Sequence, residues 1–215
     1  MNANAPQIGE RYLGARYVAD PLGEGTGYDT DPLIRFDAFD CMTFVETSMA
    51  NGNVDTLNKI RYHDGVVGFV NRNHFVATQW LQHNAARVEN VSSDYGKTQT
   101  RKITNDIAPW LRTVHGIDTS FSPITTNLTY IPYANLQTIN NTEPLIVLFV
   151  VGPRENVNLA TDIAVVHMGF LLPGGTILRH ASSQYGRVMD ANFHKYIESR
   201  KRMNNNIGIA LVRMK

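Results

Sequence analysis

Four short apolar runs in the last third of the chain constrain its fold more than any other feature. They lie at residues 145–151, 163–172, 176–181 and 207–214, and residues typical of turns separate them. Runs of this kind, rich in β-branched residues, predict β-strands. Residues 190–200 have helical spacing and lie between the last two runs. We therefore expect the four runs to form a mainly antiparallel sheet.

The first two thirds of the chain show helical spacing and loops. Residues 8–18 are loosely helical, and residues 20–32 form a loop rich in Gly, Pro and Asp. The spacing of apolar residues predicts further helices from residue 40 or 41 to 50, from 53 to 63 and from 73 to 83. Residues 103–114 are also spaced for a helix, in which Pro109 either interrupts the helix or begins a new one.

Helices followed by strands indicate an α+β fold, in which N-terminal helices pack on a mainly antiparallel sheet from the C-terminal third. We predict a single domain over residues 1–215, with residues 1–35 as an N-terminal helix and loop extension. A chain of this length buries about 70% of its unfolded surface when it folds. A core of that size needs neither a disulfide nor a structural metal.

Charge and hydropathy argue against several functional classes. The 20 Lys and Arg residues nearly balance the 19 Asp and Glu residues, so nucleic acid is not expected as a partner. The longest wholly apolar run, 145–151, is too short for membrane insertion. The first residues lack the basic and apolar segments of a signal peptide, so none is predicted, and earlier removal of a leader stays open. No obligate protein partner is evident. The seven histidines include no pair spaced for a metal on one helix, and we predict no metal and no cofactor.

Cys41, the single cysteine, is the first candidate for chemistry. It follows Asp40, a residue typical of helix N-caps, and opens a predicted helix. The helix dipole and the backbone N–H groups at that position favour a thiolate, and the same groups can bind an oxyanion. The alternative is that Cys41 is a small buried hydrophobic residue, as a lone cysteine usually is. Position alone favours this alternative.

Two histidines in the predicted sheet are candidate partners for the thiol. His167 interrupts an apolar strand, and Gly169 lies two residues further along the same face. His180 ends the next predicted strand, after a turn at 173–175, and can orient His167 and fix its tautomer. The two histidines share a face only if the hairpin loop has an even number of residues or contains a bulge. For His167 the alternative is a core histidine that a backbone carbonyl satisfies.

Further blocks of sequence accompany Cys41, His167-Met-Gly169 and His180. They are Phe39-Asp-Cys41-Met-Thr-Phe-Val-Glu46, Asn71-Arg-Asn-His-Phe75, His180-Ala-Ser-Ser183 and Gly208-Ile-Ala-Leu-Val-Arg213. This ordered set runs across nearly the whole chain and resembles the NlpC family of papain-like cell-wall hydrolases. Within that family it is most similar to the N-acetylmuramoyl-L-alanine amidase-like branch. The resemblance implies a papain-like (NlpC-type) domain.

The resemblance also implies the roles of the three candidate residues. In such a Cys-His-His triad, Cys41 is the nucleophile, His167 the base and His180 the orienting group. In such enzymes the backbone N–H groups at the nucleophile, here Cys41, bind the oxyanion that forms during the reaction. Related enzymes also place a tyrosine near this oxyanion. The segment Leu13-Gly-Ala-Arg-Tyr17 resembles that motif and makes Tyr17 the candidate, with Tyr28 as its competitor.

The same resemblance suggests that Asn71, Arg72 and His74 line the substrate cleft. Arg72 and His74 can bind a carboxylate or sugar hydroxyls, and Trp80 can stack on a sugar face. The equally weighted alternative is a structural segment, a capped helix start with Trp80 in the core. Ser182 and Ser183 can donate hydrogen bonds to substrate, but capping of the next turn is the preferred interpretation.

The sequence therefore predicts a cysteine amidase that hydrolyses the N-acetylmuramoyl-L-alanine bond of peptidoglycan fragments. The branch resemblance implies soluble anhydro-muropeptides as substrates. The alternatives are a stem-peptide endopeptidase of the same superfamily and an inactive muropeptide-binding protein. Because its substrate lies outside the cytoplasm, we expect a periplasmic or secreted protein.

Overall fold

The computed structural model describes residues 7–153, 155–156 and 160–215. Contacts within the chain divide it into two compact units, each built from three segments. Unit 1 contains the described residues up to 72, Ile139–Val147 and His167–Glu198. Unit 2 contains Asn73–Thr138, the described residues of 148–166 and Ser199–Lys215. The expectation of one domain over 1–215 stays a prediction.

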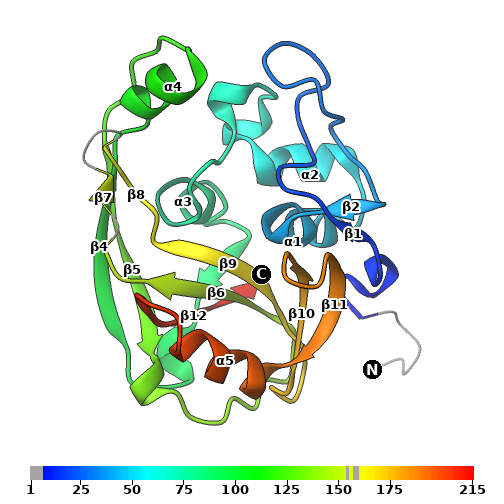
Figure 1. Cartoon of the computed structure of the whole chain (residues 1–215), viewed down its shortest axis with the longest axis vertical. Coiled ribbons are helices and arrows are strands. Elements are labelled where there is room, and N and C mark those ends of the chain that lie inside the picture. The colour runs from blue at the N-terminus through cyan, green and yellow to red at the C-terminus, as the bar shows by residue number, and fades with distance from the viewer. Residues whose placement is uncertain (1–6, 154, 157–159) are drawn as a thin grey trace. The chain divides into compact units, whose positions relative to one another are not determined.

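Unit 1 combines the helices α1 and α2 with a set of mostly antiparallel strands (Figure 1). Its elements are η1 (Glu10–Tyr12), β1 (Arg16–Tyr17), β2 (Ala38–Phe39), α1 (Cys41–Met49), α2 (Val54–Arg61), η2 (His63–Gly65), η3 (Phe69–Asn71), β10 (Ile177–Ser182) and β11 (Arg187–Asn192). Three more elements continue from one unit into the other: β6 (Leu145–Val151), β9 (Val165–Leu171) and α5 (Phe193–Lys201). The strand order is β2-β1-β11-β10-β9, and β1 and β2 are the parallel pair within it.

Unit 2 is built around the antiparallel strands β4, β5 and β12. Its elements are η4 (Val76–Trp80), α3 (Leu81–His83), β3 (Val88–Asn90), η5 (Ser92–Asp94), β4 (Gln99–Asn105), α4 (Ile107–His115), β5 (Ile124–Pro132), η6 (Tyr133–Asn135), β7 (Glu155–Asn156), β8 (Thr161–Asp162) and β12 (Asn206–Met214). β5 pairs with both β4 and β12, β3 pairs with β12, and β7 pairs with β8. The structure combines helices with mainly antiparallel strands, which confirms the expected mixture of helices and antiparallel sheet. The papain-like assignment stays a prediction.

The start of α1 follows directly from the residues at 40–43. The Asp40 carboxylate accepts a hydrogen bond from the Thr43 amide at 2.7 Å, and the Thr43 hydroxyl accepts one from the Asp40 amide at 3.0 Å. This reciprocal pair satisfies two amides that a helix start otherwise leaves without partners. The predicted helix is therefore confirmed, and its first residue is Cys41. α1 packs against β10, which lies beside it in Figure 1.

Several predicted elements are wrong, wholly or in part. Residues 8–18 hold the 3₁₀ turn η1 and the strand β1 instead of a helix. The helix predicted over 73–83 is confirmed over 76–83, where the π-helical η4 continues into α3. Residues 103–105 close β4, so the helix over this region starts only at Ile107, with Asp106 as its cap. Pro109 falls in the first turn of α4, where its missing N–H is tolerated.

The prediction that strands occur only in the last third is also wrong. β4 and β5 lie in the middle of the chain, and most of their residues are polar. In β4, exposed residues alternate with buried ones. The helix predicted over 190–200 is confirmed as α5 from Phe193 onward, whereas residues 190–192 belong to the strand β11. The four apolar runs are confirmed as β6, β9, β10 and β12 with small shifts at their ends. Among the described residues, none of the helices has the length and apolar character needed to cross a bilayer.

Candidate active site

Cys41 is half-buried at the first turn of α1. The backbone N–H groups of Cys41 and Met42, at the helix start, are directed toward its sulfur. The amide of Met168 on β9 also donates a hydrogen bond to the sulfur. Met168 directly follows His167, so the hydrogen bond brings the thiol to the segment of β9 that carries the predicted base. All of these residues belong to unit 1.

The ionisation of Cys41 differs from the expectation of a ready-made thiolate. Burial, followed by the negative charge of Asp40, raises the pKa of Cys41 from 9.0 to about 12. The amides of Met168, Cys41 and Met42 act in the opposite direction, but they do not compensate. Desolvation outweighs the helix N-terminus because a charged sulfur loses its hydration when it is buried. The resting group is therefore a neutral thiol that needs a base.

This pKa predicts how Cys41 reacts with iodoacetamide. Because the reactive thiolate is scarce below the pKa, alkylation at pH 8 is expected to be about 10³-fold slower than for an ordinary cysteine. The rate should rise about tenfold per pH unit between pH 7 and 10. Mass spectrometry reads the reaction unambiguously because the chain has one cysteine. The urea-unfolded chain is the control, and fast alkylation of the native protein with a plateau at pH 7 would contradict the prediction.

The two predicted histidines form a hydrogen-bonded pair in unit 1. Nε2 of His167 and Nδ1 of His180 lie 2.8 Å apart, and both side chains are buried. Their rings meet nearly at a right angle, with centroids 4.9 Å apart. A shared proton between these atoms fixes the tautomer of each ring. This pairing joins the predicted base to its predicted orienting group.

The hairpin register explains why the two histidines share a face. Leu171 pairs with Leu178, and the Leu172 amide donates to the Ile177 carbonyl, which leaves residues 173–176 as the loop. A four-residue loop is even, as the pairing of His167 and His180 requires. The loop includes Thr176, so a three-residue turn at 173–175 does not occur.

Gly169 makes room for His180 on the neighbouring strand. A Cβ atom on Gly169 would lie 2.8 Å from the Cβ of His180 and 2.8 Å from the carbonyl oxygen of Arg179. Both distances are too short for a side chain, so β9 and β10 can approach this closely only with glycine here. The glycine singled out in the sequence therefore sets the position of the second histidine.

Tyr196 on α5 is a further residue at the histidine pair, and the sequence analysis missed it. Its ring centroid lies 5.0 Å from that of His180 and 5.9 Å from that of His167. Contact with both rings restricts their rotation and covers them on this side. The only signal in the sequence was its place in the predicted helix 190–200, which does not indicate that the helix contacts the histidines.

The structure distinguishes the two candidate tyrosines. Parallel pairing of β1 with β2 places Tyr17 opposite Phe39, two residues before Cys41. Burial, then the charges of Cys41 and Asp40, raise the pKa of Tyr17. Tyr28 is instead 53% exposed and packs on Phe69, with ring centroids 4.4 Å apart. Strand pairing therefore brings Tyr17, and not Tyr28, opposite the strand that leads into Cys41, and its role at the oxyanion stays a prediction.

Arg72 does not have the environment expected of a substrate-binding residue. Its buried guanidinium donates to Glu24 at 2.7 Å, to Asp29 at 2.6 Å and to Asp20 at 3.2 Å. These carboxylates belong to the predicted loop 20–32 and already neutralise the arginine. Arg72 therefore holds this loop in place, and the expectation that it binds a substrate carboxylate is wrong. Asn71, half-buried at the end of η3, stays a predicted binding residue.

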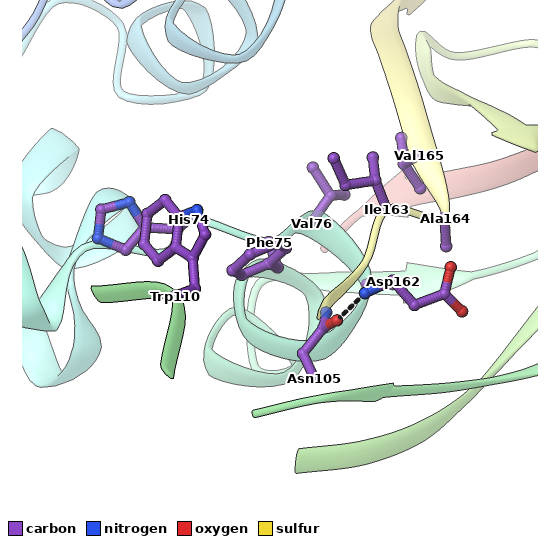
Figure 2. A pocket seen from close by; sticks show the side chains of 10 residues that line it. His74, Phe75, Val76, Asn105, Trp110, Asp162, Ile163, Ala164 and Val165 are labelled. Carbon is purple, nitrogen blue, oxygen red and sulfur yellow. Dashed lines mark hydrogen bonds between the residues drawn. The ribbon is translucent and has the colours of Figure 1, made fainter. Parts of the chain in front are cut away.

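Trp80 is fully buried, so the prediction that it stacks on a sugar is wrong. The structural alternative is right in placing Trp80 in the core, although no side-chain cap from Asn71 or Asn73 begins the turn η4. The other tryptophan, Trp110 on α4, is half-buried and lines a pocket with His74 and Phe75 (Figure 2). Its place in an apolar helical pattern gave no reason to single it out.

The two serines after His180 differ in their surroundings. Ser182 is buried at the end of β10, and its Oγ accepts a hydrogen bond from the Tyr185 amide at 3.3 Å. Ser183 is exposed in the following turn. The geometry of Ser182 agrees with the preferred interpretation, capping of the turn. Among the residues that the structure describes, no cluster of His, Cys, Asp and Glu is arranged to hold a metal ion.

The chain is similar to a known protein family and to several solved structures. Residues 7–207 match a family model called AmiA-like and described as N-acetylmuramoyl-L-alanine amidase-like. A Legionella pneumophila protein has a similar structure, with a TM-score of 0.85 and 22% identity over 96% of this chain and 86% of that one. An N-acetylmuramoyl-L-alanine amidase from Bacteroides uniformis has a TM-score of 0.75 and 22% identity over 98% of this chain and 100% of that one. No curated protein matches the sequence.

Proposed function

Because the chain belongs to the AmiA-like family of N-acetylmuramoyl-L-alanine amidase-like proteins, we propose that it is a cysteine amidase of the NlpC type with a papain-like domain. Its substrate is the amide bond between N-acetylmuramic acid and L-alanine in peptidoglycan fragments, and the resemblance favours anhydro-muropeptides. One observation carries the cysteine mechanism: His167 and His180 form a hydrogen-bonded pair. The amide of Met168, which follows His167 on β9, is a hydrogen-bond donor to the Cys41 sulfur.

The proposed reaction starts from the neutral thiol. If the shared proton lies on Nε2 of His167, Nδ1 of this ring is the basic nitrogen, and we assign to it the proton of Cys41. The sulfur attacks the lactyl carbonyl of the muramic acid, and the carbonyl π electrons move to oxygen. The amides at the start of α1 and the Tyr17 hydroxyl stabilise the resulting oxyanion. Moving the proton during attack avoids a buried, unpaired thiolate, which the raised pKa makes costly.

Collapse of the tetrahedral intermediate breaks the C–N bond. Protonated His167 delivers its proton to the leaving nitrogen, so the peptide departs with a free L-alanine amine and a thioester remains on Cys41. His167 then removes a proton from water, and the hydroxide attacks the thioester carbonyl. Release of the muramic acid carboxyl group returns the proton to sulfur. His180 keeps the proton on Nε2 of His167 throughout, so that Nδ1 is the atom that gains and loses the second proton, and Tyr196 limits rotation of both rings.

For substrate binding in unit 1 we propose Asn71, with Ser183 as an exposed donor near His180. His74 belongs to unit 2 and stays a predicted binding residue there. Ser182 serves mainly as a turn cap. No cofactor enters this mechanism, and no protein partner or nucleic acid is needed. The natural place for such an enzyme is the periplasm or the cell exterior, where peptidoglycan fragments occur.

The position of the cut tests the proposal. Incubation with defined anhydro- and reducing-end muropeptides is expected to release the free sugar and a stem peptide that still begins with L-alanine. Mass spectrometry distinguishes these products, and the relative rates test the preference for the anhydro sugar. A cut inside the stem peptide would instead indicate an endopeptidase. Intact substrate after long incubation would favour a muropeptide-binding protein, for which an unreactive buried thiol suffices.

A further inference from the structure

Unit 2 contains a pocket, lined in part by His74, whose residues take no part in the proposed proton transfers or bond cleavage. It has a volume of about 240 Å³ and opens between α4, the segment before η4 and the segment that joins β8 to β9. Trp110, Phe75 and Ile163 provide its apolar walls, and His74 lies next to the indole. Figure 2 shows these side chains around the pocket. All of the lining residues belong to unit 2.

The tryptophan in this pocket is held in place by other rings. Its ring centroid is 4.8 Å from that of His74 and 5.4 Å from that of Phe75. His115 contacts it from within α4, with centroids 4.5 Å apart. Rings packed at these steep angles restrict the indole to one orientation. Trp110 is nevertheless half-buried, so part of its surface is accessible to a ligand.

The polar wall of the pocket is already paired with protein groups. Asn105 accepts a hydrogen bond from the Asp162 amide at 2.5 Å and donates one to the Thr78 hydroxyl at 2.9 Å. The Asp162 carboxylate accepts a bond from Arg101 at 2.6 Å. A charged ligand therefore finds no unpaired countercharge on this wall. The remaining contact surface is aromatic and aliphatic, and across from the indole Ile163 is 51% exposed.

The size of the pocket restricts what can fill it. An apolar cavity of about 150 Å³ binds benzene, and pockets for drug-sized ligands start at about 300 Å³. A pocket of about 240 Å³ therefore fits one six-membered ring with its substituents. A ring with a C–H face matches the indole, because the negative face of the aromatic system attracts polarised C–H groups.

From these observations we propose that the pocket binds one N-acetylated pyranose ring, with its C–H face against Trp110 and a hydroxyl group toward His74. The choice of a sugar rests on the proposed function, because the sugar is the six-membered ring of a muropeptide. In this proposal Trp110, and not the fully buried Trp80, provides the aromatic contact with the sugar. His74 is the one polar side chain that the proposal assigns to the sugar, so binding of a single sugar is expected to be weak.

Tryptophan fluorescence of the Cys41→Ala protein gives a direct test, because substrate is not consumed. The probes are N-acetylmuramic acid and N,N′-diacetylchitobiose, with the free stem peptide as the comparison. The sugars are expected to shift the emission, since Trp110 is accessible and Trp80 is fully buried. Trp110→Ala should abolish the shift and weaken saturation-transfer NMR binding at least tenfold. Phe121→Ala, at an exposed aromatic residue outside the pocket, is the matched control and should retain binding.

A second variant guards against misfolding of Trp110→Ala. Ile163→Lys changes the opposite, exposed wall and is expected to weaken sugar binding by a similar factor while the indole stays in place. Unchanged emission with both sugars, retained affinity in the two variants, or binding of the stem peptide in place of the sugars would overturn the proposal. Because the measurement needs no turnover, it separates this pocket from the amidase proposal: hydrolysis without sugar binding contradicts only the pocket.

Discussion

Replacing Cys41 by alanine is expected to abolish release of the stem peptide from muropeptides, lowering kcat by about 10⁴-fold or more. Alanine removes the atom that forms the thioester, and no second cysteine can replace it. The fold should be retained, because Cys41 contributes no cap to α1 and the Asp40–Thr43 pair stays intact. The measurement is the product yield from anhydro-muropeptide by mass spectrometry, together with circular dichroism of the variant.

Ser48→Ala is the matched control for this substitution. Ser48 lies on the same helix, and within the described residues its buried hydroxyl has no hydrogen-bond partner, so its removal should cost little stability. This control should keep near-normal activity. A Cys41→Ala protein that folds and still hydrolyses the substrate at more than a tenth of the normal rate would exclude a cysteine nucleophile.

The second large effect is expected at His180. His180→Phe keeps a ring in a buried site but removes the nitrogen 2.8 Å from His167, so the base loses the partner that fixes its tautomer. By comparison with the loss of the equivalent partner in a serine protease triad, kcat should fall by about 10²- to 10⁴-fold. KM should change much less, because His180 is assigned no contact with substrate. Steady-state kinetics on one anhydro-muropeptide separates the two effects.

Two further variants make this prediction specific to the hydrogen bond. His180→Asn retains an oxygen acceptor and is expected to recover part of kcat. His194→Phe makes the same exchange at an exposed histidine on α5 and should leave kcat unchanged. If His180→Asn were as inactive as His180→Phe, packing would explain the loss better than the hydrogen bond. Full activity in His180→Phe would remove His180 from the mechanism.

The predictions that succeeded were those with a strong local cause. Asp40 and Thr43 form reciprocal hydrogen bonds over four residues, so the start of α1 was visible in the sequence. The runs that became β6 and β12 are apolar because most of their residues are buried, and burial leaves a clear record in composition. β4 lacked such a record. Its buried positions include Arg101, which is neutralised by Asp162 from a distant segment.

The candidate site residues likewise divide into those with a local cause in the sequence and those whose surroundings come from distant segments. Trp80 and Trp110 are the same residue type in similar apolar surroundings, and only packing decides that one is buried and the other lines a pocket. Arg72 could bind a substrate carboxylate as far as its sequence neighbours indicate. Its actual partners, Glu24 and Asp29, come from a loop more than forty residues earlier in the chain. Sequence spacing contains no information about such contacts.

The sequence by itself determined the chemical types at the candidate site: one thiol at a helix start, and two imidazoles that can share a face only across an even loop. These follow from helix capping and the two-residue period of strands, which are local rules. Only the tertiary structure decided that Thr176 joins the loop and that Tyr196 contacts both imidazoles. It also decided that burial raises the pKa of Cys41, against the effect of the helix dipole. Register, desolvation and ring contacts depend on atoms that distant segments bring together.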